Sequence, residues 1–381
     1  MKILHYKATV WREQGGVVGA VLALCAELAR AGHEVTLASY DPRDVPQSWF
    51  AGGPGLPRVL RVPSMRFPAG LLGRGVLAGA VAQSDIVHLH SMWQLPTLRI
   101  GAVCRRLGTP YVVSIHGMLD DWTITKGLLK KRVFLGAGGR RWLERAGAVH
   151  CTAEAELAQS AKWFPRGRGV VAPLFLEWEP YERLPGPEIA RSRWPSLSRG
   201  PSVLFLSRLH PKKGVELLLG AMGALWSEGS PARLLIAGTG ETAYEAALRR
   251  LAAPHGDKVE FLGFVSGEAK ISLLQAADVF ALASYQENFG YALFEALAAG
   301  TPVVTSRDVD TWRELVASGG AVAAERTPAA FAAAIREVLE NPARREEMGR
   351  AGRQWAVSNL RPGVVIARYE EMYRDAMRRQ A

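Results

Sequence analysis

The most informative side chain in this sequence is that of Glu295, because it stands alone in an apolar, helix-forming run at residues 291–299. A helix that is apolar on every face is normally buried. A carboxylate buried there requires hydrogen-bond donors or a cation. Glu287 lies eight positions upstream, on the loop that leaves an apolar strand at residues 279–283. Two carboxylates at one strand end can accept hydrogen bonds from the hydroxyls of a sugar.

The same segment predicts a helix end that suits an anion. The helix should begin near Gly290 and stop at Gly300, ahead of a strand at residues 302–305. The first amides of a helix lack partners within it, and the helix dipole favours negative charge there. In α/β folds, ligands bind at the carboxyl ends of the strands. A sugar nucleotide fits this arrangement. The alternative interpretation is that Glu287 and Glu295 are structural residues paired with arginines.

Two cations follow another apolar strand, at residues 203–206. That strand leads into Ser-Arg-Leu-His-Pro-Lys-Lys-Gly, which places Arg208 and Lys213 at its carboxyl end, before a helix. A guanidinium and an ammonium at one strand edge can hold a diphosphate. A solvated basic loop is the simpler alternative.

Glycines mark two further turns. Gly15 and Gly16 open the first predicted helix, where glycine lets the backbone come close to a ligand. Residues 238–243 read Gly-Thr-Gly-Glu-Thr-Ala after a strand, with Glu260 about twenty residues further on, as in a dinucleotide fingerprint. That pattern taken alone suggests an oxidoreductase. However, it belongs to the second strand and helix of its domain, whereas the fingerprint usually opens a domain.

Three histidines stand on or after strands of the first half. His116 follows the strand at residues 111–115, where an imidazole can meet a sugar hydroxyl; a structural histidine bonded to the backbone is the alternative. His88 and His90 alternate on one strand and so share a face, a spacing that metals use. Because no third ligand is in view, the sequence favours packing or acceptor-side roles for this pair.

Apolar strands alternate with helical patterns throughout, which predicts parallel sheets covered by helices. The first series of strands lies at residues 3–6, 35–39, 86–89, 111–115 and 148–151, and the second at 203–206, 234–238, 259–262, 279–283 and 302–305. A Pro-rich, poorly periodic segment separates the two series. We therefore predict two doubly wound α/β domains, at residues 1–177 and 202–363, joined by a linker at residues 178–201.

Composition narrows the class of protein. A hydrophobic content of 48% over 381 residues excludes general disorder. The three cysteines, Cys25, Cys104 and Cys151, are widely spaced in apolar surroundings, so we expect core thiols. The first residues contain no apolar leader, and the longest apolar run, residues 17–29, is interrupted by Glu27. We expect a cytoplasmic protein without a membrane-spanning helix.

The positive charge is uneven. Residues 1–190 carry 23 Lys and Arg against 15 Asp and Glu, a net of +8, and the remainder carries 24 against 21, a net of +3. No nucleic-acid signature is present. The run from Lys126 to Arg145 interleaves basic and apolar residues in a long helical pattern, which is typical of a helix that lies on an anionic membrane. A helix with one core stripe and one solvated charged face is the alternative.

The segment E-N-F-G-Y-A-L-F-E-A-L-A-A-G-T-P-V-V, which begins at Glu287, resembles the E-x7-E signature of the retaining glycosyltransferase family four. R-L-x-x-x-K-G, from Arg208 to Gly214, is similar to that family's clamp for the leaving group. The resemblance implies the GT-B fold, in which two Rossmann-like domains face each other across a cleft. It also implies that a last helix, at residues 364–381, packs back on the first domain.

The resemblance implies a role for each matching residue. It assigns catalytic or leaving-group contacts to Arg208, Lys213, Glu287 and His116, and donor contacts to Gly15, Gly16, Gly240, Val265, Asn288, Phe289, Gly290 and Glu295. Glu295 would hold the ribose, and Glu287 would help to orient the hexose. Asp308 and Asp310 match the D-x-D that other glycosyltransferases use for a divalent metal, but the resembled family does not need it. We therefore expect neither a metal nor another cofactor.

The sequence thus predicts a retaining transferase that moves a hexosyl unit from UDP- or GDP-hexose to a saccharide or a lipid-linked saccharide. Exopolysaccharide, capsule or lipopolysaccharide synthesis is the expected setting, on the inner face of the membrane if the basic run docks there. The alternatives are a sugar-nucleotide epimerase of the same shape, an NAD(P)-dependent oxidoreductase that uses Gly238 to Ala243, and, last, a sugar-binding scaffold without activity.

Overall fold

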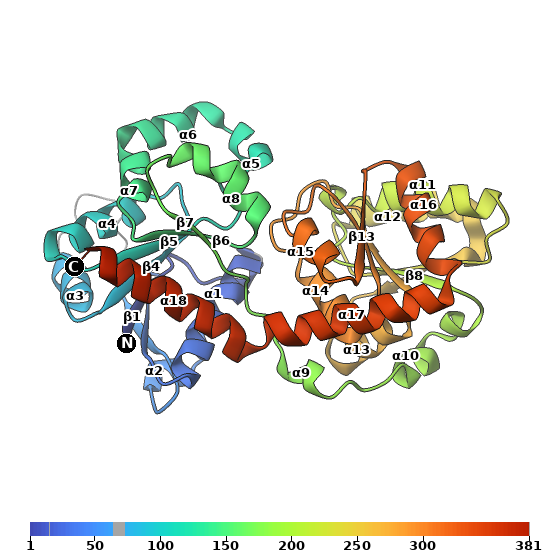
Figure 1. The fold of residues 1–381 in the computed structure, drawn as a ribbon, viewed down its shortest axis with the longest axis horizontal. Helices are drawn as coiled ribbons and strands as arrows, with labels where there is room; N and C mark the ends of the chain where they lie inside the picture. The colour runs from blue at the N-terminus through green and yellow to red at the C-terminus, as the bar shows by residue number, and fades with distance from the viewer. Residues whose placement is uncertain (15, 64–72, 381) are drawn as a thin grey trace. The chain divides into compact units, whose positions relative to one another are not determined.

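In a computed structural model, the chain is described over residues 1–14, 16–63 and 73–380. It divides into two compact units. Unit 1 comprises Met1–Phe175 with Pro362–Ala381, and unit 2 comprises Leu176–Arg361 (Figure 1). The structure thus divides the chain at 175/176 and 361/362, whereas the sequence predicted boundaries at 177, 202 and 363.

Seven parallel strands form the sheet of unit 1 within the described ranges, in the order β3-β2-β1-β4-β5-β6-β7. Their bounds are β1 (Lys2–Tyr6), β2 (Glu34–Ser39), β3 (Arg58–Arg61), β4 (Ile86–His90), β5 (Tyr111–Ser114), β6 (Ala148–Cys151) and β7 (Gly169–Val171). Alternate residues of each strand face opposite sides. Leu4 and Tyr6 therefore join one core cluster, whereas Ile3 joins the other.

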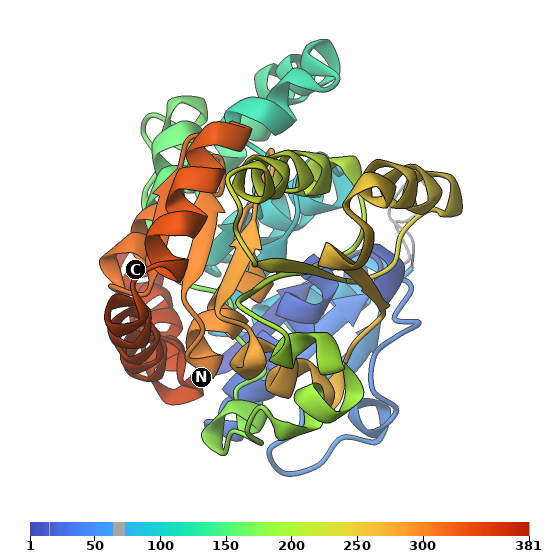
Figure 2. The ribbon, with the colours of Figure 1, turned by 90° about the vertical axis from the view of Figure 1, so that its right-hand side faces the viewer.

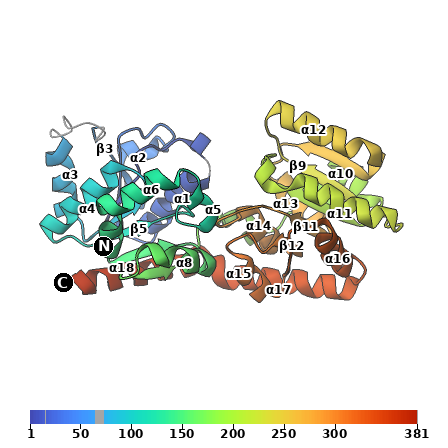
Figure 3. The ribbon, with the colours of Figure 1, turned by 90° about the horizontal axis from the view of Figure 1, so that it is seen from above.

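Helices cover both faces of this sheet. Among them are α1 (Gly16–Arg30), α2 (Ser48–Ala51), α3 (Gly73–Ala82), α4 (Leu95–Leu107), α7 (Arg140–Glu144), α8 (Glu154–Ser160), the 3-10 turns at Arg12–Gln14 and Ala161–Trp163, and α18 (Pro362–Gln380). α3 and α4 lie side by side (Figure 3). Together with α7, they contribute residues to the core on one face of the sheet. α1 and α18 cover the other face, where Val365 and Tyr373 are fully buried.

Unit 2 contains a second parallel sheet, with six strands in the described residues, in the order β10-β9-β8-β11-β12-β13. The strands are β8 (Ser202–Leu206), β9 (Arg233–Ala237), β10 (Val259–Gly263), β11 (Val279–Leu282), β12 (Val303–Ser306) and β13 (Ala321–Ala324). The helices are α11 (Val215–Ser227), α12 (Thr242–Ala252), α13 (Gly267–Ala276), α14 (Tyr291–Ala299), α15 (Trp312–Ala317), α16 (Pro328–Leu339) and α17 (Pro342–Leu360), with 3-10 turns at Pro211–Lys213 and Ala253–Lys258. Figure 2 shows this sheet between helices on both of its faces.

The segment predicted as a linker at residues 178–201 belongs to unit 2 instead. It forms α9 (Glu179–Glu182), α10 (Glu188–Arg193) and a 3-10 turn at Pro195–Ser198. The amide of Ala190 donates to Ser272 Oγ at 2.9 Å, and α10 packs on α13. Prolines hide the periodicity of the segment, but its apolar residues Tyr181, Trp194 and Leu197 are buried.

The long helical stretch predicted for the basic run is broken into pieces. α5 (Asp121–Thr125), α6 (Leu128–Phe134), a π-helical turn at Leu135–Gly139 and α7 follow one another. Gly127 and Gly138 adopt φ angles of 73° and 130°, which are strained for other residues. As a result, Trp142 of α7 is buried in the core, whereas Leu129 and Val133 of α6 are 76% and 62% exposed.

Candidate active site

The loop after β8 places Arg208 beside a glycine-rich turn. Arg208 is exposed, and within the described part of the chain it has no ion-pair partner. Its side chain lines a cavity of about 480 Å³ whose other walls are Leu206, Ser207, Ala237, Gly238, Thr239, Gly240, Phe264 and Val265. The structure therefore brings together three of the predicted site residues, namely Arg208 of the leaving-group set and Gly240 and Val265 of the donor set.

Two glycines allow the loops around this cavity to pack closely. A Cβ atom on Gly238 would lie 1.9 Å from the carbonyl oxygen of Ser207, and one on Gly240 would lie 2.1 Å from that of Leu209. The amide of Leu209 also donates to the carbonyl of Thr239 at 2.9 Å. The resemblance of this turn to a dinucleotide fingerprint thus has a local cause, because the glycines fit one backbone loop against another.

Lys213 and Glu287 form an ion pair between the loops that follow β8 and β11. The backbone joins the same loops, since the amide of Tyr285 donates to the carbonyl of Lys212 at 2.8 Å. The two side chains are 17% and 22% exposed. The predicted phosphate ligand Lys213 is therefore already paired with a predicted sugar ligand.

The helix α14 begins and ends where the sequence predicted. Gly290 is its N-cap, with a left-handed φ of 73° and no side-chain cap, and Gly300 is its C-cap. The loop before it is held by the loop after β12, because Asn288 Nδ2 donates to Asp310 Oδ2 at 3.2 Å and Thr311 Oγ1 donates to the carbonyl of Phe289 at 2.8 Å. An N-terminus without a capping side chain suits an anionic ligand.

Glu295 is paired with a cation that the sequence did not point to. Lys270 Nζ of α13 donates to Glu295 Oε1 at 2.8 Å, and the carboxylate side chain is 16% exposed. Burial and this carboxylate raise the pKa of the neighbouring Tyr291 hydroxyl. The expected donor to Glu295 thus exists, but it is a lysine of the preceding helix rather than an arginine. A signal for it lies in the spacing of α13, because the residues three and four positions after Lys270 are the buried Leu273 and Leu274, which lie on the same side of the helix.

The D-x-D pair is engaged with protein donors. Arg326 Nε donates to Asp308 Oδ2 at 2.7 Å, and Asp310 is 4% exposed and accepts the bond from Asn288. Asp308 thus ties the loop after β12 to the turn after β13, whereas Asp310 ties it to the loop ahead of α14.

In unit 1, His116 follows β5 and is buried, with a left-handed φ of 49°. Such a conformation is costly for a residue other than glycine and is concentrated at functional sites. The buried carboxylate of Glu156, in α8, accepts hydrogen bonds from the amides of Gly117 and Thr152, and from Thr152 Oγ1 at 2.9 Å. Glu156 therefore fixes the turn that carries His116. The sequence does not reveal this link, because forty positions separate the two residues.

Gly16 is the first residue of α1, and Gly15 lies outside the described residues. Cys25, Cys104 and Cys151 are buried free thiols, which confirms the prediction. No helix among the described residues is long and apolar enough to cross a membrane.

The two units each have a parallel sheet whose candidate ligand-binding loops follow the ends of the strands. This is the architecture of the GT-B glycosyltransferases, and solved structures share the fold. The UDP complex of Alr3699/HepE from Anabaena matches with a TM-score of 0.78 and 16% identity, over 97% of this chain and 99% of that one. WaaG, a glycosyltransferase involved in lipopolysaccharide biosynthesis, matches with a TM-score of 0.67 and 16% identity, over 97% and 98%.

Sequence comparisons then identify the family. The model for glycosyl transferases group 1 matches residues 188–355, and that for the glycosyl transferase 4-like domain matches residues 15–174. The phosphatidyl-myo-inositol mannosyltransferase of Mycolicibacterium smegmatis is 30% identical over 81% of this chain and 76% of its own length. The alpha-monoglucosyldiacylglycerol synthase of Streptococcus pneumoniae is 25% identical over 80% and 70%. The chain belongs to the group 1 glycosyltransferases, within family four.

Proposed function

We propose that this protein transfers a hexosyl unit, with retention of the anomeric configuration, from UDP- or GDP-hexose to a saccharide or a lipid-linked saccharide. The observation that carries the proposal is the cavity beside Arg208, which joins an exposed guanidinium to the Gly238 turn at the strand edge. The sugar-nucleotide class is further supported by the UDP complexes of HepE, whose fold this chain shares. Relatives that are named for lipid acceptors support the acceptor class.

The cations of unit 2 supply the electrostatic part of the mechanism. Negative charge develops on the diphosphate as the glycosidic bond breaks, and fixed positive groups stabilise it in the transition state. Arg208 is available for this role, and Lys213 joins it when a phosphate replaces Glu287 as its partner. The first amides of α14 add a third source of positive potential. We infer that these groups act without a metal.

The carboxylates and His116 orient the sugar. Glu287, once released by Lys213, accepts hydrogen bonds from hexose hydroxyls, while Glu295 and Lys270 together meet the ribose. In unit 1, His116 contacts the transferred sugar or its acceptor. Retention proceeds by attack on the face that the diphosphate leaves, so no covalent glycosyl-enzyme intermediate accumulates, in contrast to retaining hydrolases.

An anionic membrane surface is the proposed location of a lipid-linked acceptor. α6 exposes Leu129 and Val133. Beside it, a hollow of about 560 Å³ is lined by Arg132, Arg140, Arg141 and Arg166, with Glu144 and Trp163. Exposed apolar residues among arginines favour contact with the headgroups of an anionic bilayer. Exopolysaccharide, capsule or lipopolysaccharide synthesis is the setting that this location fits.

Thermal unfolding with candidate ligands tests the proposal. A ligand that binds only the folded state at one hundred times its Kd stabilises it by about 2.7 kcal/mol. We expect UDP and UDP-glucose, or GDP and GDP-mannose, to raise Tm in the wild type and in the surface control Arg344→Ala, but much less in Arg208→Ala. Stabilisation by NAD(P) alone would exclude the transferase. Conversion of the donor sugar to its epimer without an acceptor would favour the epimerase.

A further inference from the structure

Five of the eight histidines of the chain meet in the core of unit 1. They are His5 of β1, His88 and His90 of β4, His116 after β5, and His150 of β6, and each is buried. The strands place them on the sheet face that α1 and α18 cover, since Ile3, Ile86, Val112 and Ala148 point to the same side. Buried polar groups require hydrogen-bond partners, so each ring nitrogen of this cluster should have one.

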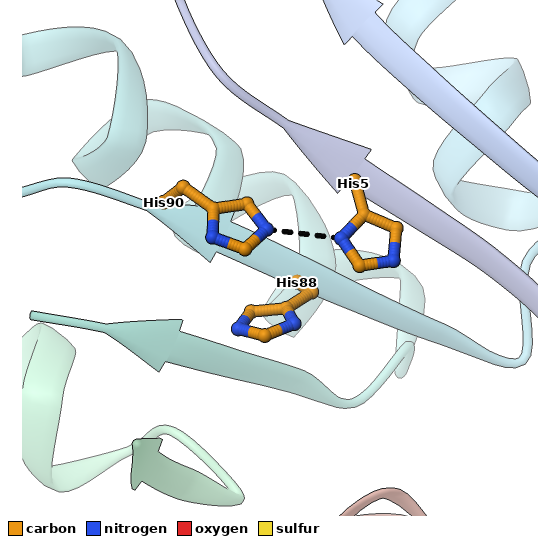
Figure 4. Close-up of side chains that lie close together, drawn as sticks. All are labelled: His5, His88 and His90. Atoms are coloured by element: carbon orange, nitrogen blue, oxygen red, sulfur yellow. Dashed lines mark hydrogen bonds between the residues drawn. The ribbon is translucent and has the colours of Figure 1, made fainter. Parts of the chain in front are cut away.

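His5 supplies the third imidazole that the sequence did not reveal beside His88 and His90. A nitrogen of each ring lies within 4.8 Å of the others, as a metal site would require. However, His5 Nδ1 and His90 Nε2 point at each other and are only 2.9 Å apart (Figure 4). An ion midway between them would lie closer to each nitrogen than the ~2.0 Å of a metal–nitrogen bond. Both nitrogens of His88 are already hydrogen-bonded. The arrangement is a hydrogen-bond network rather than a ligand set.

In the half of the network that contains His150, Ser114 and His88, the donor and the acceptor of each hydrogen bond can be assigned. His150 Nε2 lies 2.9 Å from the carbonyl oxygen of Ala172, which can only accept, so this nitrogen carries the proton. Because burial lowers the pKa of His150 to about 4, the ring is neutral and Nδ1 accepts from Ser114 Oγ at 2.6 Å. Ser114 Oγ must then accept from His88 Nε2 at 2.7 Å, and His88 Nδ1 from the Tyr373 hydroxyl at 2.7 Å. The Tyr369 hydroxyl, 3.3 Å from His150 Nε2, is a second acceptor for the same proton. The protons of His150, Ser114 Oγ, His88 and the Tyr373 hydroxyl are thereby assigned.

In the other half, which contains His5, His90 and His116, no hydrogen bond to a backbone carbonyl of the described residues fixes which nitrogen carries the proton. His5 Nδ1 bonds to His90 Nε2 at 2.9 Å, and His90 Nδ1 bonds to His116 Nε2 at 3.3 Å. The end atoms, His5 Nε2 and His116 Nδ1, are buried and have no hydrogen-bond partner among the described residues. Burial lowers the pKa of His5 and of His116 to about 3, and that of His90 well below its usual range, so each ring carries one proton.

Neutral rings in such a chain share one tautomer. The protons lie either on the three Nε2 atoms, so that His116 Nδ1 accepts, or on the three Nδ1 atoms, so that His116 Nδ1 donates. Each arrangement leaves one buried donor and one buried acceptor unpaired at the ends of the chain of histidines. The two arrangements therefore contain the same number of hydrogen bonds, and neither is favoured on that ground. Interconversion takes up one proton at His116 Nδ1 and releases one at His5 Nε2, so water has to reach both buried ends transiently to carry these protons.

We propose that His90 and His5 are positioning residues for His116: they hold its ring, and the sugar oxygen that meets His116 Nδ1 selects one tautomer for all three histidines. The contact with sugar rests on the function proposed above, whereas the shared tautomer is a property of the free protein. His116 can thereby donate to one hydroxyl oxygen or accept from another without taking a charge into the core.

Nitrogen NMR of the protein labelled with ¹⁵N-histidine tests the shared tautomer without ligand. We expect His88 and His150 to be protonated on Nε2 alone, and His5, His90 and His116 to have matching populations of the two tautomers. His90→Asn keeps a polar atom near the position of Nδ1 but breaks the link to His5, so the populations of His5 and His116 should no longer match. Different protonated nitrogens on His5 and His116 in the wild type, or a match that survives His90→Asn, would overturn the inference.

The signals of His88 and His150 report in the same spectra whether the core of the variant is folded. If His90→Asn does not fold, His5→Phe removes the far end of the chain, and the tautomer population of His116 should shift.

Turnover supplies a second readout. With UDP-glucose or GDP-mannose as the probe, His5→Phe should lower kcat about tenfold with little change in KM, because His116 would orient the sugar less well while the groups of unit 2 that bind the nucleotide and the diphosphate are unchanged. An unchanged kcat would contradict a positioning role. Failure of the wild type to bind any nucleotide in the thermal test would instead refute the proposed function. The NMR result would still decide whether His5, His90 and His116 share one tautomer.

Discussion

Lys213 and Glu287, 74 positions apart in the sequence, form an ion pair that joins the loops after the neighbouring strands β8 and β11. Both side chains are largely buried. Removal of one partner leaves the other charge poorly solvated and unpaired. The pair therefore holds the free site together, and a bound diphosphate has to compete with Glu287 for the ammonium.

A double-mutant cycle measures this coupling. Lys213→Ala and Glu287→Ala should each lower the free energy of unfolding by about 1–2 kcal/mol, and the double variant should lose less than the sum. Urea unfolding supplies the values, and the exposed pair of Arg344 and Glu337 serves as a control with little coupling. Strictly additive losses would contradict the ion pair in solution.

The geometry of Arg208 should matter more than its charge. Arg208→Lys keeps a cation beside the cavity but loses the planar fork that matches phosphate oxygens. We expect kcat/KM for sugar transfer to fall by about 10–100-fold with Tm unchanged. Arg344→Lys is the matched substitution on the surface of α17. Full activity of Arg208→Lys would remove Arg208 from the leaving-group site.

The close packing of the loops at the strand edge predicts a cost for a single methyl group. A Cβ atom on Gly214, where φ is 69°, would lie 2.1 Å from the carbonyl oxygen of Ala283. Gly229 has a φ of 91° but nothing within 4 Å of its Cβ position. Gly214→Ala should therefore destabilise unit 2 by about 3 kcal/mol, against about 1 kcal/mol for Gly229→Ala. Equal losses in chemical unfolding would show that the loops are not packed as described.

Stability should fall on mild acidification. Burial depresses the pKa of His5, His88, His90, His116 and His150 below the ordinary value of 6.5. The unfolded chain binds protons below about pH 6.5, but the folded protein does not, so this stability is present above pH 6.5 and is lost as the pH falls toward 3–4.

The slope is about 1.4 kcal/mol per pH unit for each histidine that is protonated only on unfolding. Urea unfolding between pH 7.5 and 5 measures it while most carboxylates remain ionised. His5→Phe should reduce the slope by one proton. A slope that is the same in the wild type and in His5→Phe would mean that His5 is solvated.

Membrane binding should depend on the exposed apolar residues of α6. We expect Leu129→Asp with Val133→Asp to abolish flotation with phosphatidylglycerol vesicles, and high salt to weaken flotation of the wild type. Leu251→Asp, on an exposed position of α12 in unit 2, is the control. Equal binding to neutral phosphatidylcholine vesicles would rule out a role for the arginines.

By itself, the sequence determined the architecture and the position of most candidate residues along it. Alternation of apolar strands and helices predicts parallel α/β units because each pattern has its own period. Gly290 and Gly300 located the ends of α14 because glycine tolerates the left-handed backbone there. The resemblance around Glu287 and Arg208 then indicated the family, which the comparisons confirm.

Only the tertiary structure decided which side chains are partners. Lys270 pairs with Glu295, and Glu156 holds the turn of His116, across 25 and 39 positions of chain. His5 meets His90 across 85 positions because β1 and β4 are neighbours in the sheet, although they are far apart in sequence. Spacing fixes only which residues share a face of one strand or helix. The order of strands and the packing of helices determine which faces meet, and those depend on the whole chain.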